Sequence, residues 1–219
     1  MQISSKICRL LWGVTAVLSL SSCHGFFGGI YDEPIEETSD GFGFIKINEA
    51  TRTGTIYIDA SDYTKWNYIS LKDKKVVIAL YDEQQPENWD FAVHRYDAKT
   101  NGASVFETEY YDLTDISSVF KFSGADFVVD EWTTNKITID MSQMMEGIIK
   151  YAEDFYNPCL SKWLNVDTSS MPPVYTLSEK VYILKLQDET YAALKLSDFM
   201  NTSGIKGFMT IDYLYPVTQ

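Results

Sequence analysis

The sequence contains little histidine, and no catalytic motif surrounds the histidines that it has. His24 and His94 are the two in 219 residues, and neither lies in a G-x-S-x-G or H-E-x-x-H sequence. A Ser-His-Asp arrangement would have to be built on His94. The chain also lacks a P-loop, a G-x-G-x-x-G turn and the D-x-[DN]-x-[DN]-G spacing of a calcium loop. These absences favour a binding protein over an enzyme.

Positive charge is also scarce. The 18 Lys and Arg residues are outnumbered by 31 Asp and Glu residues, which gives a net charge of −13. Because phosphate backbones are bound through Lys and Arg, this charge excludes nucleic acid as a partner. Hydrophobic residues make up 45% of the chain and aromatic residues 15%, so a folded core is expected.

The N-terminus lacks both acidic residues and a long hydrophobic run. Residues 1–22 carry basic residues and a short apolar stretch, Leu10 to Leu20. A membrane span needs about 20 apolar residues, so this stretch is a secretory signal peptide. Leu20-Ser21-Ser22-Cys23 resembles the bacterial lipobox, whose cysteine is diacylated and becomes the first residue. We expect cleavage after residue 22 and anchoring of the protein to the membrane through Cys23.

Cysteine usage agrees with this interpretation. Cys8 leaves with the signal peptide, and a lipidated Cys23 cannot form a disulfide, so Cys159 remains without a partner. Cys159 is interpreted as a small buried hydrophobic residue, with an exposed thiol as the alternative.

The mature chain divides into a tether and one domain. Residues 23–40 mix Gly, Pro and acidic residues without periodicity and are interpreted as the lipidated N-terminus and a flexible tether. Residues 41–219 would form the domain, because fewer than about 200 residues normally form a single one.

Alternating and β-branched segments predict an antiparallel, mainly β domain. Residues 181–186 and 191–196 are expected to form a hairpin around a loop at 187–190. Residues 143–162 have weak helical character, so a short helix or loop excursion is expected there. The other predicted strands cover residues 55–59, 75–80, 136–140 and 207–215.

One aromatic segment suggests the centre of the sheet. Trp66 and Trp89 are predicted to anchor its core, and Asn101-Gly102 to form a tight turn with positive φ. Asp90 and Arg95 could form an ion pair. His94 lies inside a strand-like stretch and is interpreted as a hydrogen-bonded structural histidine, with a ligand role as the alternative.

Four blocks of this sequence together resemble the HmuY family, the haem-binding lipoproteins (haemophores) of Bacteroidetes. They are IDASDYTKWNYISL, NWDFAVHRYDAKTNG, KWLNVDTSSMPPVYTLSEKVYILKL and MTIDYLYP, within about residues 55–216. The resemblance implies an all-β fold that holds one haem between finger-like hairpins. It also implies iron and haem acquisition, in which host haemoproteins are haem sources and a TonB-dependent outer-membrane receptor accepts the haem.

The resemblance further implies axial haem ligands, and here the sequence departs from the founding type, which uses two histidines. The corresponding segments, 140–147 and 164–175, contain methionine and no histidine, and some relatives look like bis-methionine haem binders. The first candidate ligand is Met171, before the stiff Pro172-Pro173. The second is Met144, with Met145 as the alternate. The competing interpretation is that these methionines fill gaps in an apolar core.

The expected location is the outer membrane, with the protein anchored by lipid at the cell surface and the periplasmic face as the alternative. An acidic stretch directly after the lipidated cysteine often accompanies surface export in this group, but here the acidic residues begin at Asp32. The competing function is that of a glycan-binding or adhesin-like surface lipoprotein, which would use the same scaffold without haem.

Overall fold

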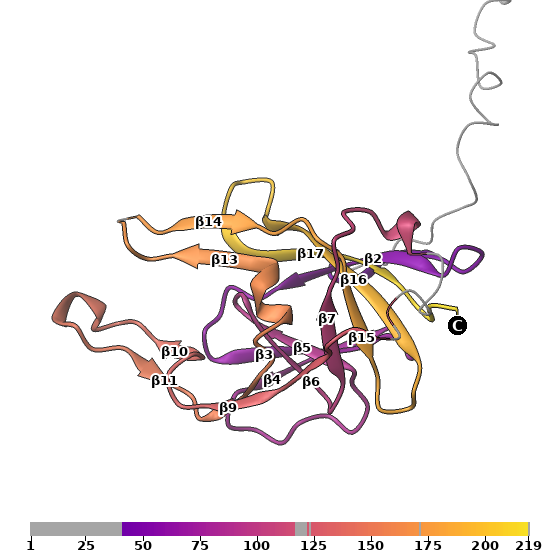
Figure 1. Ribbon diagram of the computed structural model, residues 1–219. Coiled ribbons are helices and arrows are strands. Elements are labelled where there is room, and N and C mark those ends of the chain that lie inside the picture. The colour runs from indigo at the N-terminus through magenta and orange to yellow at the C-terminus, as the bar shows by residue number, and fades with distance from the viewer. Residues whose placement is uncertain (1–40, 117–121, 123, 171, 219) are drawn as a thin grey trace, which may run out of the picture. The chain divides into compact units, whose positions relative to one another are not determined.

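The strands of this chain form two main antiparallel sheets. The computed structural model describes residues 41–116, 122, 124–170 and 172–218. A seven-stranded sheet has the order β1-β2-β17-β16-β15-β7-β8 (Figure 1). Its strands are β1 (Gly43–Asn48), β2 (Thr53–Asp59), β7 (Ser104–Glu107), β8 (Val128–Val129), β15 (Tyr182–Lys185), β16 (Tyr191–Met200) and β17 (Lys206–Leu214).

The second sheet is four-stranded, in the order β4-β3-β5-β6. Its strands are β3 (Lys65–Ser70), β4 (Lys75–Leu80), β5 (Phe91–His94) and β6 (Asp97–Thr100). β5 and β6 are joined by the two residues Arg95 and Tyr96, and Arg95 has a φ of 51°. The predicted turn at Asn101-Gly102 is confirmed, because Gly102 has a φ of 67°.

The main core lies between the two sheets. Alternate residues of β2 and β17, such as Ile56 and Ile211, are buried in one cluster with Ile69 and Phe91 of the smaller sheet. This alternation follows from the two-residue period of a strand, which places every second side chain on the core face. In β17, Met209, Ile211 and Tyr213 are buried on this face.

The other face of the four-stranded sheet is covered as well. Trp66 and Trp89 pack there with Ile137 and Ala152, which belong to a later segment of the chain. Every residue of β5 is therefore buried, as expected for a strand enclosed on both faces. The two tryptophans are core anchors, as predicted, with exposed fractions of 0% and 8%.

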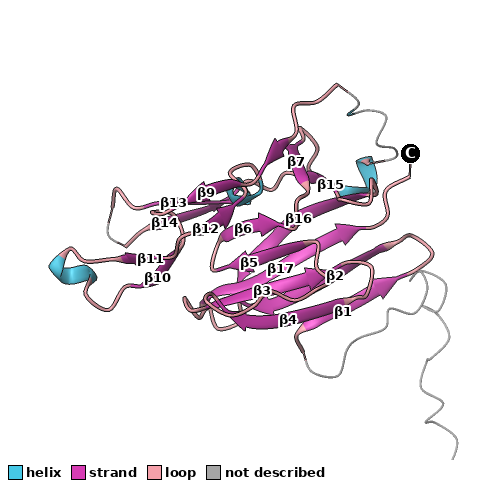
Figure 2. Cartoon of the chain, turned by 90° about the horizontal axis from the view of Figure 1, so that it is seen from below, coloured by secondary structure: helices cyan, strands magenta, loops and turns pink. Residues whose placement is uncertain are grey.

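Three short two-stranded ribbons extend from the sheets: β9 with β12, β10 with β11, and β13 with β14. Figures 1 and 2 both show the β10–β11 and β13–β14 hairpins projecting on the same side of the sheets, next to each other. The ribbon strands are β9 (Glu131–Thr133), β10 (Thr138–Asp140), β11 (Lys150–Tyr151), β12 (Asp154–Tyr156), β13 (Leu164–Asp167) and β14 (Val174–Leu177).

The expected excursion at 143–162 contains two single 3-10 turns, η3 (Met144–Glu146) and η4 (Leu160–Trp163), with β11 and β12 between them. A third 3-10 turn, η1 (Leu113–Asp115), follows β7. The fold is mainly antiparallel β, as predicted. Within the part of the chain that the structure describes, no helix has the length and apolar character to cross a membrane. The signal peptide, Cys23 and the tether lie outside the described residues.

Candidate functional site

The β13–β14 hairpin is held firmly at its root. Trp163, which directly precedes β13, is fully buried, and its Nε1 donates a hydrogen bond to the carbonyl oxygen of Tyr96 (3.1 Å). The ring of Tyr175 on β14 stacks on Phe199 at 5.6 Å between centroids. From this root the strands run in register, Leu164 opposite Leu177, to a tip at residues 168–173.

The β10–β11 hairpin has its own root in the core beneath the four-stranded sheet. Ile137 is fully buried there, and its carbonyl oxygen accepts a hydrogen bond from the amide of Ala152 (2.8 Å). Further out, Lys150 Nζ lies 2.9 Å from Asp140 Oδ2. The tip, residues 141–149, contains the η3 turn and ends through Gly147, whose φ is 79°.

The two tips begin in the same way. Each contains the pattern D-x-S-x-M, as Asp140 to Met144 and as Asp167 to Met171. In each, the last residue of the outgoing strand accepts a hydrogen bond from the serine amide two residues later: Ser142 N to Asp140 Oδ1 (2.9 Å) and Ser169 N to Asp167 Oδ1 (2.8 Å). Such Asx turns reverse the backbone locally.

Both aspartates remain ionised at the tips. The hydrogen bond from Lys150 lowers the pKa of Asp140, and the hydrogen bonds from Ser169 lower the pKa of Asp167. A carboxylate that accepts such bonds is stabilised in its charged form. Each tip therefore begins with an ionised aspartate, and a methionine follows four residues later in the sequence.

The candidate methionines differ in exposure. Met144 is half-buried, whereas Met145 is 90% exposed. Met144 is held by the η3 turn, where its amide donates to the carbonyl oxygen of Met141 and its carbonyl oxygen accepts from the amide of Gly147, both at 3.0 Å. Met171 lies outside the described residues. Its assignment as a ligand remains a prediction.

Large apolar side chains lie exposed beside these tips. Ile148 and Tyr151 follow η3 with exposed fractions of 49% and 38%, and Val174 at the start of β14 is 52% exposed. Sequence reasoning did not single out these three residues. The available signal was the presence of apolar residues next to a loop that also carries methionine.

The structure confirms that His94 is a hydrogen-bonded structural residue. It is fully buried in β5, and its Nε2 lies 2.7 Å from the carbonyl oxygen of Tyr63. Its ring also packs 5.1 Å from that of Trp66. Burial lowers the pKa of His94 to about 4, so the side chain is neutral at pH 7.

Two further expectations are settled by the structure. Cys159 is 5% exposed, which confirms the buried thiol, and burial raises its pKa. The predicted ion pair between Asp90 and Arg95 does not form, so that prediction is wrong. Asp90 Oδ2 instead accepts from the amide of Leu71 (2.6 Å), and Arg95 donates to the carbonyl oxygen of Ser61 (2.9 Å). The two side chains therefore bond to the backbone and not to each other.

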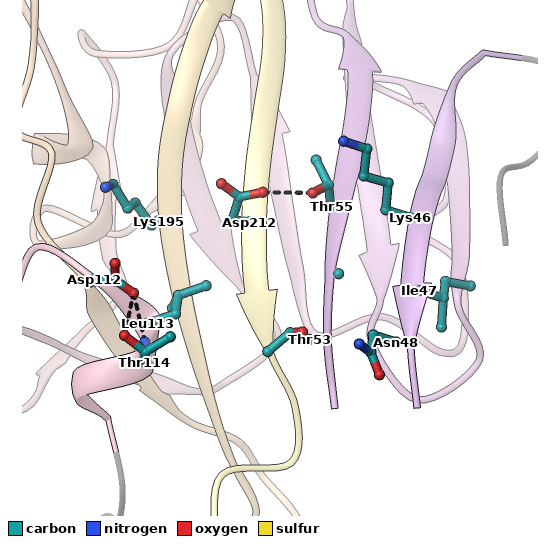
Figure 3. Close-up of a pocket in the computed structure, with 11 residues that line it drawn as sticks. Lys46, Ile47, Asn48, Thr53, Thr55, Asp112, Leu113, Thr114, Lys195 and Asp212 are labelled. Carbon is teal, nitrogen blue, oxygen red and sulfur yellow. Dashed lines mark hydrogen bonds between the residues drawn. The ribbon is translucent and has the colours of Figure 1, made fainter. Parts of the chain in front are cut away.

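A pocket of about 360 Å³ lies elsewhere, on the outer face of the seven-stranded sheet (Figure 3). Asp212 projects between Lys46 and Lys195, and it accepts a hydrogen bond from Thr55 Oγ1 (2.7 Å). Lys195 Nζ donates to the carbonyl oxygen of Tyr111 (2.7 Å). None of the predicted site residues lines this pocket.

In the part of the chain that the structure describes, no three His, Cys, Asp or Glu side chains are placed to hold a metal ion.

The fold and the tips thus define a class: an antiparallel β protein that presents two methionine-bearing hairpins on one side. The sequence model of the family described as HmuY protein matches residues 62–213. The chain belongs to the HmuY family.

Solved structures agree with this assignment. A proposed HmuY-like haem-binding protein from Bacteroides vulgatus is 51% identical, with a TM-score of 0.77, over 81% of this chain and 100% of that one. A proposed lipoprotein from Bacteroides fragilis is 50% identical, with a TM-score of 0.76, over 84% of this chain and 100% of that one. The apo HmuY analogue of Tannerella forsythia shares the fold at 22% identity, with a TM-score of 0.64, over 74% and 94%. No curated protein matches the chain.

Proposed function

We propose that this protein is a haemophore that binds one haem between the tips of the β10–β11 and β13–β14 hairpins. Met171 and Met144 would be the axial ligands of the iron, with Met145 as the alternate to Met144. The family and the name of the Bacteroides vulgatus relative support haem as the ligand.

One observation carries the proposal: the D-x-S-x-M pattern stands at the tips of two hairpins that project side by side (Figure 2). Asp140 and Asp167 start the same Asx turn, and four residues after each of them the sequence has a methionine, Met144 and Met171. Met145 has no counterpart in this pattern. The correspondence supports Met144 over Met145 as the second ligand.

Two methionine ligands suit haem iron better than they suit a cation such as Ca²⁺ or Mg²⁺, which prefers oxygen ligands. Thioether sulfur is a soft, neutral axial ligand that raises the iron potential and so favours the ferrous state. The exposed Ile148, Tyr151 and Val174 beside the tips offer apolar surface on which a porphyrin would lose contact with water. A bound haem would supply the iron, and this chain would supply the two axial ligands and an apolar surface for the porphyrin.

The wider role follows from the anchor and the family. Lipidation at Cys23 would tether the domain to the outer membrane, at the cell surface or on its periplasmic face. Haem taken from host haemoproteins would pass to a TonB-dependent outer-membrane receptor. The Bacteroides fragilis relative is itself a proposed lipoprotein, which supports the anchored state.

A titration of the purified protein with haem under dithionite tests the proposal. Sharp low-spin bands are expected for the wild type. Met171→Leu and Met144→Leu keep the side-chain volume but remove the sulfur, so each should convert the spectrum to a five-coordinate form and weaken binding by about tenfold or more. Met145→Leu is the matched control and should leave the spectrum unchanged.

The outcomes distinguish haem binding itself from the assignment of its ligands. No spectral change with wild-type protein would overturn haem binding itself. An unchanged spectrum in Met171→Leu would overturn the ligand assignment. The low-spin bands should also persist at pH 5, because methionine does not titrate, whereas a histidine ligand with an ordinary pKa of about 6.5 would be lost.

A further inference from the structure

A second pocket lies at the root of the β9–β12 ribbon, away from the hairpin tips. It has a volume of about 380 Å³ and is bounded by β6, the turn after it, and residues of the ribbon. Small-molecule sites commonly have volumes of about 300–1,000 Å³ and combine apolar walls with a few fixed polar groups. This pocket combines the same two elements.

Aromatic rings form two of its walls. Trp89 is 8% exposed and fixed in the core, whereas Phe155 on β12 is 48% exposed. Phe155 is oriented by Trp132 on β9, whose ring meets it edge-on at 5.1 Å. An exposed aromatic ring that is held in place offers a preorganised apolar face to a ligand.

The floor of the pocket contains a buried ion pair. Lys99 Nζ lies 2.6 Å from Asp154 Oδ2, and the lysine side chain is 2% exposed. The same ammonium lies over the rings of Trp66 (4.2 Å) and Tyr68 (5.2 Å). The lysine therefore already occupies the cation-binding position that the aromatic rings create.

A second carboxylate is held rigidly beside this pair. Asp130 accepts hydrogen bonds from the amide of Thr100 (2.7 Å), the hydroxyl of Thr100 (2.9 Å) and Nδ2 of Asn157 (2.9 Å). Asp154 accepts from Lys99 and from the amide of Phe155 (2.7 Å). A carboxylate has about four acceptor sites. Both groups therefore keep unused acceptor capacity.

These charges restrict the ligand. An anion would meet two carboxylates, and an organic cation would find the position over the rings of Trp66 and Tyr68 already taken by the ammonium of Lys99. A purely apolar molecule would bury the spare acceptors of Asp130 and Asp154 without a donor, which costs free energy. What remains is a neutral molecule with an apolar face and several hydroxyl donors.

We propose that this pocket binds a saccharide residue, which stacks a C–H face on Phe155 and donates hydroxyl hydrogen bonds to Asp130 and Asp154. Two further lining residues add amide groups: the exposed Gln85, and Asn101, whose Nδ2 already donates to the carbonyl oxygen of Trp89 (2.9 Å) and whose Oδ1 can accept. The proposal does not depend on haem, because none of these residues belongs to the hairpin tips.

The test uses the purified full chain, kept free of haem. Glucose, galactose, mannose and N-acetylglucosamine, each as monosaccharide and disaccharide, are titrated while amide chemical shifts are followed by NMR. We expect at least one sugar to shift the amides of Thr100, Asn101 and Phe155 saturably. Phe155→Ala should weaken that binding by about tenfold or more. Phe42→Ala is the matched control, because Phe42 is 47% exposed and stacks on Tyr57 and Phe208 of the seven-stranded sheet.

Gln85→Ala, at the exposed rim, provides a second variant that should also weaken binding without affecting the core. The proposal is overturned if no sugar shifts these amides, or if Phe155→Ala binds as tightly as the wild type. It is also overturned if tetramethylammonium or acetate shifts the same amides more strongly than every sugar, since the ligand would then be charged.

Discussion

Lys99 Nζ and Asp154 Oδ2, at 2.6 Å, connect the four-stranded sheet to the ribbon that leads to the β10–β11 hairpin. The two side chains differ in access to water, with exposed fractions of 2% for Lys99 and 15% for Asp154. Burial lowers the pKa of Lys99, while the hydrogen bond from Lys99 to Asp154 counteracts this effect. The charged form of Lys99 therefore depends more on Asp154 than the charged form of Asp154 depends on Lys99.

The first prediction follows from this asymmetry. Asp154→Leu should lower the free energy of unfolding by about 3–5 kcal/mol, because it leaves a buried charge unpaired. Lys99→Met should cost less, about 1–3 kcal/mol, because the remaining carboxylate can reach water through the pocket. The double variant should recover part of the loss. Urea denaturation measures all three, and equal losses in the two single variants would contradict the asymmetry.

The second prediction concerns pH. Burial lowers the pKa of His94 to about 4 in the folded chain, whereas the unfolded chain has the ordinary value of 6.5. Between these values the unfolded state binds the extra proton, so His94 contributes stability that is complete above pH 6.5 and lost as the pH falls to about 4. The loss amounts to about 3 kcal/mol.

The contribution of Asp97 to stability has the opposite pH dependence, so its effect must be measured separately from that of His94. Burial raises the pKa of Asp97 to about 7, so the folded state binds a proton that the unfolded state releases, and this contribution is lost as the pH rises towards 7. Because the two contributions oppose each other, the free energy of unfolding of the wild type should change little between pH 7 and 4.5. His94→Gln should be more stable at pH 4.5 than at pH 7, and Asp97→Asn should be less stable at pH 4.5 than at pH 7. Identical pH profiles in all three proteins would contradict both assignments.

The third prediction concerns the root of the β10–β11 hairpin. Ile137 is fully buried against the outer face of the four-stranded sheet, so Ile137→Ala should lower the free energy of unfolding by about 2–5 kcal/mol. Ile148→Ala is the matched control at the tip, where the side chain is 49% exposed, and should change it by no more than about 0.5 kcal/mol. Similar losses in thermal or urea unfolding would show that the root does not hold the hairpin.

Sequence patterns predicted β2, β15, β16 and β17 of the seven-stranded sheet, whose residues alternate or are β-branched, but they did not predict β1, β7 or β8. The alternation at 207–215 and the hairpin at 181–196 correspond to β17, β15 and β16. Residues 143–162 were less informative. Strands of two or three residues such as β11 and β12 carry no measurable alternation, and β12 pairs with a distant strand, Phe155 opposite Trp132.

The chemistry at the ribbon root was not accessible from the sequence. A lysine is normally expected at the surface, and the rings that enclose Lys99 come from residues 66, 68 and 89, distant in the chain. The wrong pairing of Asp90 with Arg95 has a related cause, because both groups bond to backbone atoms whose position depends on the folded sheets. The methionine candidates came from the resemblance to the HmuY family, and their role as haem ligands stays a prediction.

The burial of β5 on both faces has a consequence for the hydrogen exchange of backbone amides. Amides of Ala92 and Val93 are fully enclosed, so their exchange requires opening of the whole sheet. The tips around Met144 and Ser169 are held mainly by local turns and can open separately at low cost in free energy. If haem binds at the tips as proposed, it could enter and leave while the slowly exchanging centre of the sheet stays folded.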